Sequence, residues 1–180
     1  IEDSRFYQHA GFDFRGTMRA LVSTLTGSQV QGGSTITQQY VRAVLLSPEQ
    51  TLTRKIKEAV LAVQLERQYS KQAILTKYLN LIYFGNGAYG VQAAARTYFG
   101  KDAIALNLPE SALLAGLIRS PGDYDPFTQP DAALARRNEV LSRIEILKRL
   151  PAENKNSAIA APLGVGAAPA TQRTAAPHFV

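Results

Sequence analysis

The sequence predicts a mainly α-helical fold, and three observations predict it. Apolar residues recur at intervals of three and four along most of the chain, which is the period of an amphipathic helix. Apolar and polar residues show almost no alternation with a period of two, so strands are not expected. From about Pro151 the composition changes to Ala, Pro, Gly and Asn without periodicity, which predicts an extended linker after the helical part.

The helices of the first half can be placed in order along the chain. Thr35 and Gln38 have the spacing of a capping box, so a helix is expected to begin here, after a Gly-Gly turn. Periodic apolar residues predict two more helices, over residues 53–68 and 71–83. On the helix over residues 53–68 one apolar stripe consists of Ile56, Val60 and Val63, and the neighbouring stripe consists of Leu61 and Leu65.

Two helices are expected in the second half. The segment that begins at Pro109 is apolar nearly all round and stops before a second proline, which predicts a buried central helix. An amphipathic helix is predicted from about Pro130 to Leu147. These elements predict one domain over residues 1–147 and a linker over residues 148–180 towards a further domain. The chain lacks an initiator Met and begins inside a motif, so it is expected to be a piece of something longer.

The composition limits the class of function. The 180 residues, 46% of them hydrophobic, suffice for one domain with a real core. The formal charge of +6 predicts an anionic partner: nucleic acid, lipid headgroups or a phosphorylated substrate. No nucleic-acid motif occurs, which argues against nucleic acid. The absence of cysteine excludes disulfides and Cys-ligated zinc, and two histidines are too few for a metal cluster. No apolar stretch approaches the length of a membrane span.

Two carboxylates flank a Gly-Gly-Ser-Thr turn. Glu2 lies in I-E-D-S-R-F-Y-Q-H-A-G-F and Glu58 lies in R-K-I-K-E-A-V-L. With several Arg and Lys, they make the set needed for acid–base chemistry beside an anionic leaving group. For Glu2 and Asp3 the plain alternative is an exposed acidic pair that begins a helix. Glu58 falls on an apolar stripe, where a carboxylate is costly unless it is paired or functional; the plain alternative is an i,i+4 ion pair with Arg54.

The run G-G-S-T-I-T-Q-Q can bind an anion. Its glycines let the backbone approach a ligand closely, and the following helix presents free N–H groups and the positive end of its dipole. Gln38, Gln39 and Arg42 then share a polar face. The plain alternative is a well-capped helix. Arg19 and the Arg54-Lys55 pair supply further positive charge.

Two other segments leave alternatives open. G-N-G-A-Y-G over residues 85–90 matches the dinucleotide fingerprint, but the preceding Y-L-N-L-I-Y-F continues a helical pattern and no βαβ unit appears, so a structural or cleft-lining turn is expected. The apolar segment over residues 12–30 carries Arg15 and Arg19. It suits both a core-facing helix and the interface of an anionic membrane.

The motifs around Glu2, the Gly-Gly-Ser-Thr turn and Glu58, in this order, resemble the glycosyltransferase domain of class A penicillin-binding proteins, family 51 of the glycosyltransferases. The resemblance covers residues 1 to about 144. It implies a lysozyme-like, two-lobed helical domain with a cleft. The implied reaction is inverting transfer that polymerises lipid II into β-1,4 glycan strands and releases polyprenyl diphosphate. The implied place is the outer face of the bacterial cytoplasmic membrane, with an anchor outside this chain and a downstream transpeptidase domain.

The resemblance also assigns roles to residues. Glu2 corresponds to the catalytic base, which takes a proton from the 4-hydroxyl of the acceptor sugar, and Asp3, Phe6 and His9 would support it. Glu58 corresponds to a second essential glutamate on the diphosphate side. The substrate-binding positions implied are Arg19, Ser34, Thr35, Gln38, Gln39, Arg42, Arg54, Lys55 and Asn80.

This chain departs from the family pattern at two places. Arg42-Ala43 stands where the family usually has Lys-Asn, and arginine keeps the charge and adds a fork that matches phosphate. Gln50 stands where many relatives carry a basic residue. Many relatives use a divalent cation, Mg²⁺ or Mn²⁺, which would lie near Glu2, Asp3 and the donor diphosphate; no metal-ligand spacing in this sequence demonstrates it.

Two rival functions remain at this stage. A lysozyme-like glycan hydrolase would also use carboxylates, but it would have little need for the basic residues around the Gly-Gly-Ser-Thr turn, and water would attack in place of a sugar. A non-catalytic module that binds anionic lipid would keep its binding after Glu2→Gln. Product analysis and that substitution separate the three functions.

Overall fold

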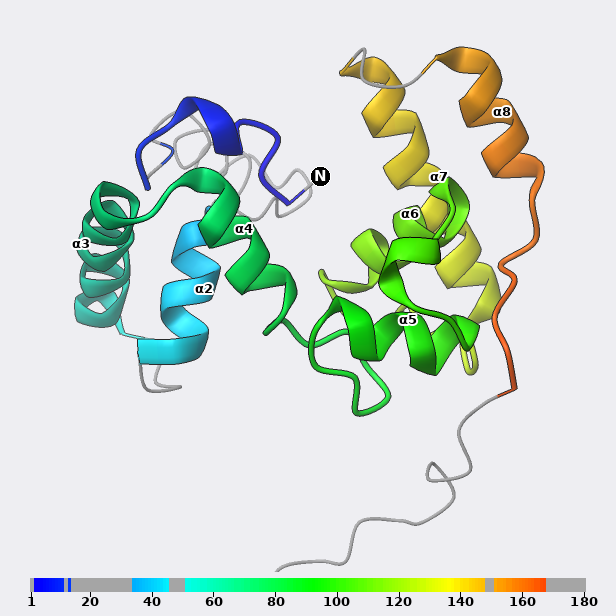
Figure 1. The fold of residues 1–180 in the computed structure, drawn as a ribbon, viewed down its shortest axis with the longest axis horizontal. Helices are drawn as coiled ribbons and strands as arrows, with labels where there is room; N and C mark the ends of the chain where they lie inside the picture. The colour runs from blue at the N-terminus through cyan, green and yellow to red at the C-terminus, as the bar shows by residue number, and fades with distance from the viewer. Residues whose placement is uncertain (1, 12, 14–33, 46–50, 148–150, 168–180) are drawn as a thin grey trace, which may run out of the picture. The chain divides into compact units, whose positions relative to one another are not determined.

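The computed structural model describes residues 2–11, 13, 34–45, 51–147 and 151–167. Within these residues there is no strand, and an isolated antiparallel bridge joins Tyr83 to Tyr89. The prediction of a mainly helical fold is confirmed (Figure 1). The elements are η1 (Phe6–Gln8), α2 (Ile36–Leu45), α3 (Leu52–Gln68), α4 (Lys71–Leu79), α5 (Val91–Phe99), η2 (Ala103–Ala105), α6 (Leu108–Leu117), α7 (Pro130–Ile146) and α8 (Ala152–Ala160).

The chain divides into two compact units. Residues 2–82 form the N-terminal unit with η1 and helices α2 to α4, and the C-terminal unit starts at Tyr83 and holds the remaining elements. Every predicted site residue belongs to the N-terminal unit. The cleft predicted between two lobes stays a prediction.

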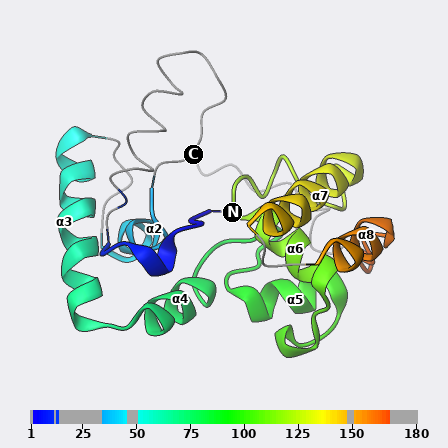
Figure 2. The same ribbon diagram turned by 90° about the horizontal axis from the view of Figure 1, so that it is seen from above.

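In the N-terminal unit α2 packs against both α3 and α4 (Figure 2). The predicted capping box at the start of α2 is confirmed: the Thr35 N–H donates to Oε1 of Gln38 over 2.8 Å, and the Gln38 N–H donates to Oγ1 of Thr35 over 3.1 Å. Thr51 and Ser70 cap α3 and α4 with their side-chain oxygens. Three side chains of α2, those of Thr37, Gln38 and Val41, are buried.

The buried face of α3 differs from the main apolar stripe predicted for it. Ile56 and Val60 are 66% and 51% exposed, whereas Glu58 and Ala62 are fully buried. The reason is close backbone packing at Ala62. A Cβ added to Gly11, whose φ is +81°, would lie 2.7 Å from the Ala62 carbonyl. A side chain at this position would clash with the backbone of α3, so the loop can approach the helix this closely only with a glycine.

In the C-terminal unit α6 packs against α7, and α7 packs against α8. A capping box fixes the start of α6: the Glu110 N–H donates to Oδ1 of Asn107 over 3.0 Å, and the Asn107 N–H donates to Oε2 of Glu110 over 2.9 Å. Most side chains from Ala112 to Leu117 are buried. The predicted buried helix after Pro109 and the predicted helix from Pro130 are both confirmed.

Beyond Pro151 the structure differs from the extended linker that the sequence predicts. Residues 152–160 form α8, and Ala158 is buried against Val140 and Leu141 of α7. Further on, the Gly166 N–H donates to the Tyr98 carbonyl over 2.8 Å. The sequence does not predict this helix, because its side chains are small and show no clear periodicity. Its position depends on tertiary contacts instead. The domain boundary predicted after residue 147 stays a prediction.

The glycine-rich turn over residues 85–90 is a loop between helices. It follows the end of α4, and α5 begins directly after Gly90, so the preceding strand that a dinucleotide site requires is not found in this described part of the chain. Gly85 has a φ of +94°, and a Cβ there would lie 2.8 Å from the Tyr98 hydroxyl. The Asn86 amide donates to that hydroxyl over 3.0 Å. The turn is therefore packed against the Tyr98 side chain of α5, as the structural interpretation predicts.

Candidate active site

Glu2, the predicted base, lies beside the first turn of α2. Nε2 of Gln39 donates to Oε2 of Glu2 over 3.3 Å, and the Tyr78 hydroxyl of α4 donates to Oε1 of Gln39 over 2.9 Å. A carboxylate only accepts hydrogen bonds, so the NH₂ group of Gln39 faces Glu2 and the amide oxygen faces Tyr78. Gln39 is therefore held at both ends of its amide.

Tyr78 stays a hydrogen-bond donor at physiological pH. Burial raises the pKa of the Tyr78 hydroxyl well above its usual range, and the negative charge of Glu2 raises this pKa further. The positive charge of Arg42 lowers the same pKa by a smaller amount. The two hydrogen bonds of the Gln39 amide place Glu2 and Tyr78 on either side of that amide.

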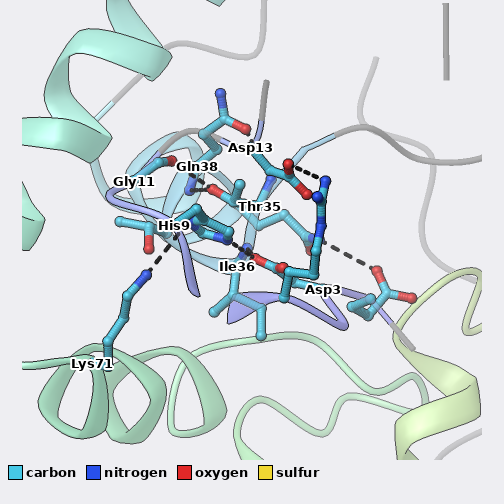
Figure 3. A network of polar contacts seen from close by, with 12 residues as sticks. Asp3, His9, Gly11, Asp13, Thr35, Ile36, Gln38 and Lys71 are labelled. Atoms are coloured by element: carbon cyan, nitrogen blue, oxygen red, sulfur yellow. Dashed lines mark hydrogen bonds and ion pairs between the residues drawn. The ribbon is translucent and has the colours of Figure 1, made fainter. Parts of the chain in front are cut away.

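Asp3 fixes the segment that carries Glu2 to the start of α2. Oδ2 of Asp3 accepts a hydrogen bond from the Ile36 N–H over 3.2 Å and lies 2.8 Å from Nε2 of His9 (Figure 3). A carboxylate at a helix N-terminus satisfies a free N–H group and is stabilised by the helix dipole. The predicted supporting role of Asp3 and His9 has a geometric basis in these contacts.

The Ser-Thr end of the turn is joined to the same segment. Oγ1 of Thr35 donates to the Gly11 carbonyl over 2.8 Å and also caps α2, and Thr35 is only 2% exposed (Figure 3). Gln38 is 1% exposed, and its side-chain oxygen accepts the Thr35 N–H. Both residues therefore stabilise the turn, and their predicted contact with substrate stays a prediction.

Glu58 is fully buried, and a lysine one turn earlier is its ion-pair partner. Nζ of Lys55 lies 2.6 Å from Oε1 of Glu58 and 2.6 Å from Oγ of Ser34. Oε2 of Glu58 is buried without a hydrogen-bond partner among the described residues. The pair observed is Lys55–Glu58 at i,i+3, in place of the Arg54–Glu58 pair considered from the sequence. Lys55 therefore links the turn before α2 to the buried carboxylate of α3.

Comparison with known proteins identifies the family. The chain matches the family model described as Transglycosylase over residues 1–145. The chain belongs to the transglycosylase family. Penicillin-binding protein 1A of Aquifex aeolicus (strain VF5) is 48% identical to it over 165 residues, which cover 91% of this chain and 23% of that protein. Penicillin-binding protein 1A of Escherichia coli (strain K12) is 53% identical over 144 residues, 79% of this chain and 17% of that protein.

A third relative extends the match along the chain. Penicillin-binding protein 1A of Streptococcus pneumoniae (strain ATCC BAA-255 / R6) is 44% identical over 169 residues, which cover 92% of this chain and 24% of that protein. The transglycosylase chain thus spans about a quarter or less of the length of these curated relatives. The family that the sequence motifs resemble is confirmed.

The other predicted substrate-binding residues of this transglycosylase occupy different surroundings. Arg42 is exposed on α2. Arg54 is partly buried, and its Nε lacks a hydrogen-bond partner among the described residues. Asn80 is the C-cap of α4, and its amide donates to the Thr76 carbonyl over 2.9 Å. Arg19, Gln50 and nearly all of the segment 12–30 lie outside the described residues, so the predictions made for them stay predictions.

Neither a metal centre nor a membrane span is found in the described part of the transglycosylase chain. These residues contain no group of three or more His, Cys, Asp or Glu placed to hold a metal ion. Asp3, near the predicted cation, already binds the Ile36 N–H and His9. A divalent cation at the donor diphosphate stays a prediction. None of the described helices is long and apolar enough to cross a membrane.

Sequence reasoning missed three residues of the site. Tyr78 falls among the periodic apolar positions of residues 71–83, and nothing in that pattern indicates that its hydroxyl holds Gln39. Lys71 and Glu66 were not singled out, yet they extend the contacts of His9. One signal was available: Lys71 is the first residue of α4, where the helix dipole disfavours a cation, so a compensating carboxylate is expected nearby.

Proposed function

We propose that this chain is a peptidoglycan glycosyltransferase domain that joins lipid II units into β-1,4-linked glycan strands. The observation that carries the proposal is Glu2, a carboxylate on a segment fixed to the first turn of α2 through Gln39 and Asp3. Membership of the transglycosylase family and the similarity to penicillin-binding proteins 1A support it. The proposed place is the outer face of the bacterial cytoplasmic membrane, in a longer protein with a transpeptidase domain.

In the proposed reaction Glu2 is the general base. Its carboxylate takes the proton of the acceptor 4-hydroxyl, and the oxygen attacks the anomeric carbon of the donor sugar. The bond from that carbon to the diphosphate oxygen breaks, the polyprenyl diphosphate leaves with the electron pair, and the configuration at the anomeric carbon inverts. The Gln39 NH₂ group orients the carboxylate, because Tyr78 holds the other end of the amide.

The proposed donor side of the site carries positive charge. Arg42 is exposed on α2, and Lys55 is held next to Ser34 at the start of that helix. Cations and free N–H groups stabilise the negative charge that develops on a leaving diphosphate. Glu58 fixes the Lys55 ammonium through their ion pair. The proposed role of Gln38 is to maintain the turn, since its side chain is buried in the cap.

Polymerisation of labelled lipid II in detergent tests the proposal. The parent protein is compared with Glu2→Gln, which keeps the shape of the side chain but cannot act as a base, with and without a divalent cation. Asp131→Asn, an exposed change on α7, is the matched control. We expect long strands from the parent and the control and a loss of at least about 100-fold in Glu2→Gln.

Each rival function has its own outcome in the same assay. Short glycan fragments in place of long strands would establish a hydrolase. Lipid II binding that is equal in the parent and Glu2→Gln, with no product from either, would establish a non-catalytic binding module and overturn the proposal.

A further inference from the structure

We propose that Lys71 is a positioning residue for the base Glu2 and acts through His9 and Asp3. The inference rests on the proposed glycosyl transfer and adds to it a residue of α4. Lys71 is far from Glu2 in the sequence, yet its contact with His9, and that of His9 with Asp3, link it to the chain neighbour of Glu2 (Figure 3).

The ring of His9 has a defined tautomer. Nε2 lies 2.8 Å from Oδ2 of Asp3, and Nδ1 lies 3.4 Å from Nζ of Lys71. The Asp3 carboxylate can only accept a hydrogen bond, so Nε2 carries a proton. The Lys71 ammonium can only donate, so Nδ1 is without one. Lys71 therefore selects the neutral tautomer that donates to Asp3.

Lys71 itself is held in place on several sides. Its Nζ lies 2.8 Å and 2.7 Å from the two carboxylate oxygens of Glu66, and 4.5 Å from the centre of the Phe6 ring. The Thr37 hydroxyl of α2 also donates to Glu66. The Lys71 side chain is 22% exposed and that of Glu66 is 5% exposed. The ammonium is therefore fixed at the corner between α3 and α4 despite the unfavourable dipole of α4.

Asp3 connects His9 to the segment that carries the base. The same Oδ2 that faces His9 accepts the Ile36 N–H at the first residue of α2. Glu2 is the neighbour of Asp3 in the chain, and Gln39, one turn further along α2, donates to Glu2. If His9 no longer binds Asp3, the Asp3 carboxylate is held less firmly against the Ile36 N–H, which is one of the anchors of the Glu2 segment to α2. Misplacement of a catalytic group by about 1 Å can cost on the order of 100-fold in rate.

The experiment compares Lys71→Met, Lys71→Arg and Lys77→Met in the polymerisation assay. Methionine keeps the apolar stem without a donor, and arginine restores a donor. Lys77 is a matched control, because it lies on the same helix with its ammonium 5.1 Å from the centre of the Tyr69 ring. We expect kcat to fall about 10-fold in Lys71→Met with KM within about twofold, to return to within about threefold in Lys71→Arg, and to be unchanged in Lys77→Met.

The state of His9 is a readout that a purely structural role would not move. The chain has only two histidines, so the ring-nitrogen NMR signals of His9 can be assigned with a His9→Gln variant. We expect the parent and Lys71→Arg to show a protonated Nε2 and an unprotonated Nδ1, and Lys71→Met to lose this pattern. If the melting temperature of Lys71→Met is well below that of the parent, Glu66→Gln is used in its place. This substitution removes the negative charge that holds the Lys71 ammonium and keeps the lysine itself.

The outcomes separate the inference from the proposed function. A Lys71→Met variant that polymerises at the parent rate overturns the inference. So does one that loses activity while its His9 signals match those of the parent. If the parent itself makes no strands, the proposed function fails. The NMR measurement still tests the inference in that case, because unchanged His9 signals in Lys71→Met would show that Lys71 does not set the tautomer of His9.

Discussion

Single side chains decide the chemistry of the candidate site, and the Lys55–Glu58 pair can be tested directly. Glu58 is fully buried, and Lys55 neutralises one of its two oxygens. In Lys55→Met the buried carboxylate loses this cation, so we expect the free energy of unfolding to fall by about 1–3 kcal/mol. The lower half of this range is favoured because the Lys55 side chain is 46% exposed and partly screened by solvent. Urea denaturation measures the change.

A second substitution separates the structural and functional roles of Glu58. Addition of Glu58→Gln to Lys55→Met removes the unpaired charge, so most of the lost stability should return, whereas strand synthesis should stay below the parent rate. Lys57→Met, an exposed change on the same helix, is the control for stability. Full polymerisation by the double variant would show that the Glu58 carboxylate has no part in the reaction.

The same residues show what the sequence can and cannot predict. Burial of Glu58 follows from its place on a helix stripe with Leu61 and Leu65, which is a local pattern. The partner of Glu58 and the exposure of Ile56 do not follow from it. The partner of Glu58 and the exposure of Ile56 depend on which face of α3 packs against the loop at Gly11. This packing is a contact between segments that are distant in the sequence.

At the scale of whole elements, local signals predicted some helices and missed another. The start of α2 was predicted because both members of its capping box are three residues apart. Helix α8 was missed because its position depends on Arg137 of α7, which is fully buried. The Arg137 guanidinium donates to the carbonyls of Ile159, Ala161 and Pro162 at the end of α8. These carbonyls lack partners within the helix, so the arginine acts as its C-terminal cap.

Removal of this cap should destabilise the C-terminal unit. In Arg137→Met the three carbonyls lose a charged donor, so we expect a loss of about 2 kcal/mol and a melting temperature lower by about 4–8 °C. Arg143→Met, an exposed change on the same helix, should melt like the parent. Circular dichroism measures both. An unchanged melting temperature in Arg137→Met would show that α8 contributes little to the stability of the fold.

At the scale of the whole molecule, positive charge is concentrated in the unit that carries the candidate site. Residues 2–82 hold ten of the 20 Lys and Arg but six of the 14 Asp and Glu, so this unit contributes +4 of the net charge of +6. A basic surface attracts an anionic membrane or a diphosphate lipid over about a Debye length. The charge of the N-terminal unit thus supports an anionic substrate, although it does not indicate which residues contact that substrate.

Binding to vesicles tests this distribution of charge. With vesicles that contain anionic lipid, we expect binding to weaken by at least about tenfold when salt rises from about 0.05 M to about 0.3 M, because salt screens surface charge. Arg42→Gln, in the N-terminal unit, should weaken binding about fivefold at low salt, since one basic residue near such a surface contributes about 1 kcal/mol. Arg143→Gln, an equal change of charge in the C-terminal unit, should have a smaller effect. Equal losses in the two variants would mean that net charge, and not its concentration around the candidate site, governs the attraction.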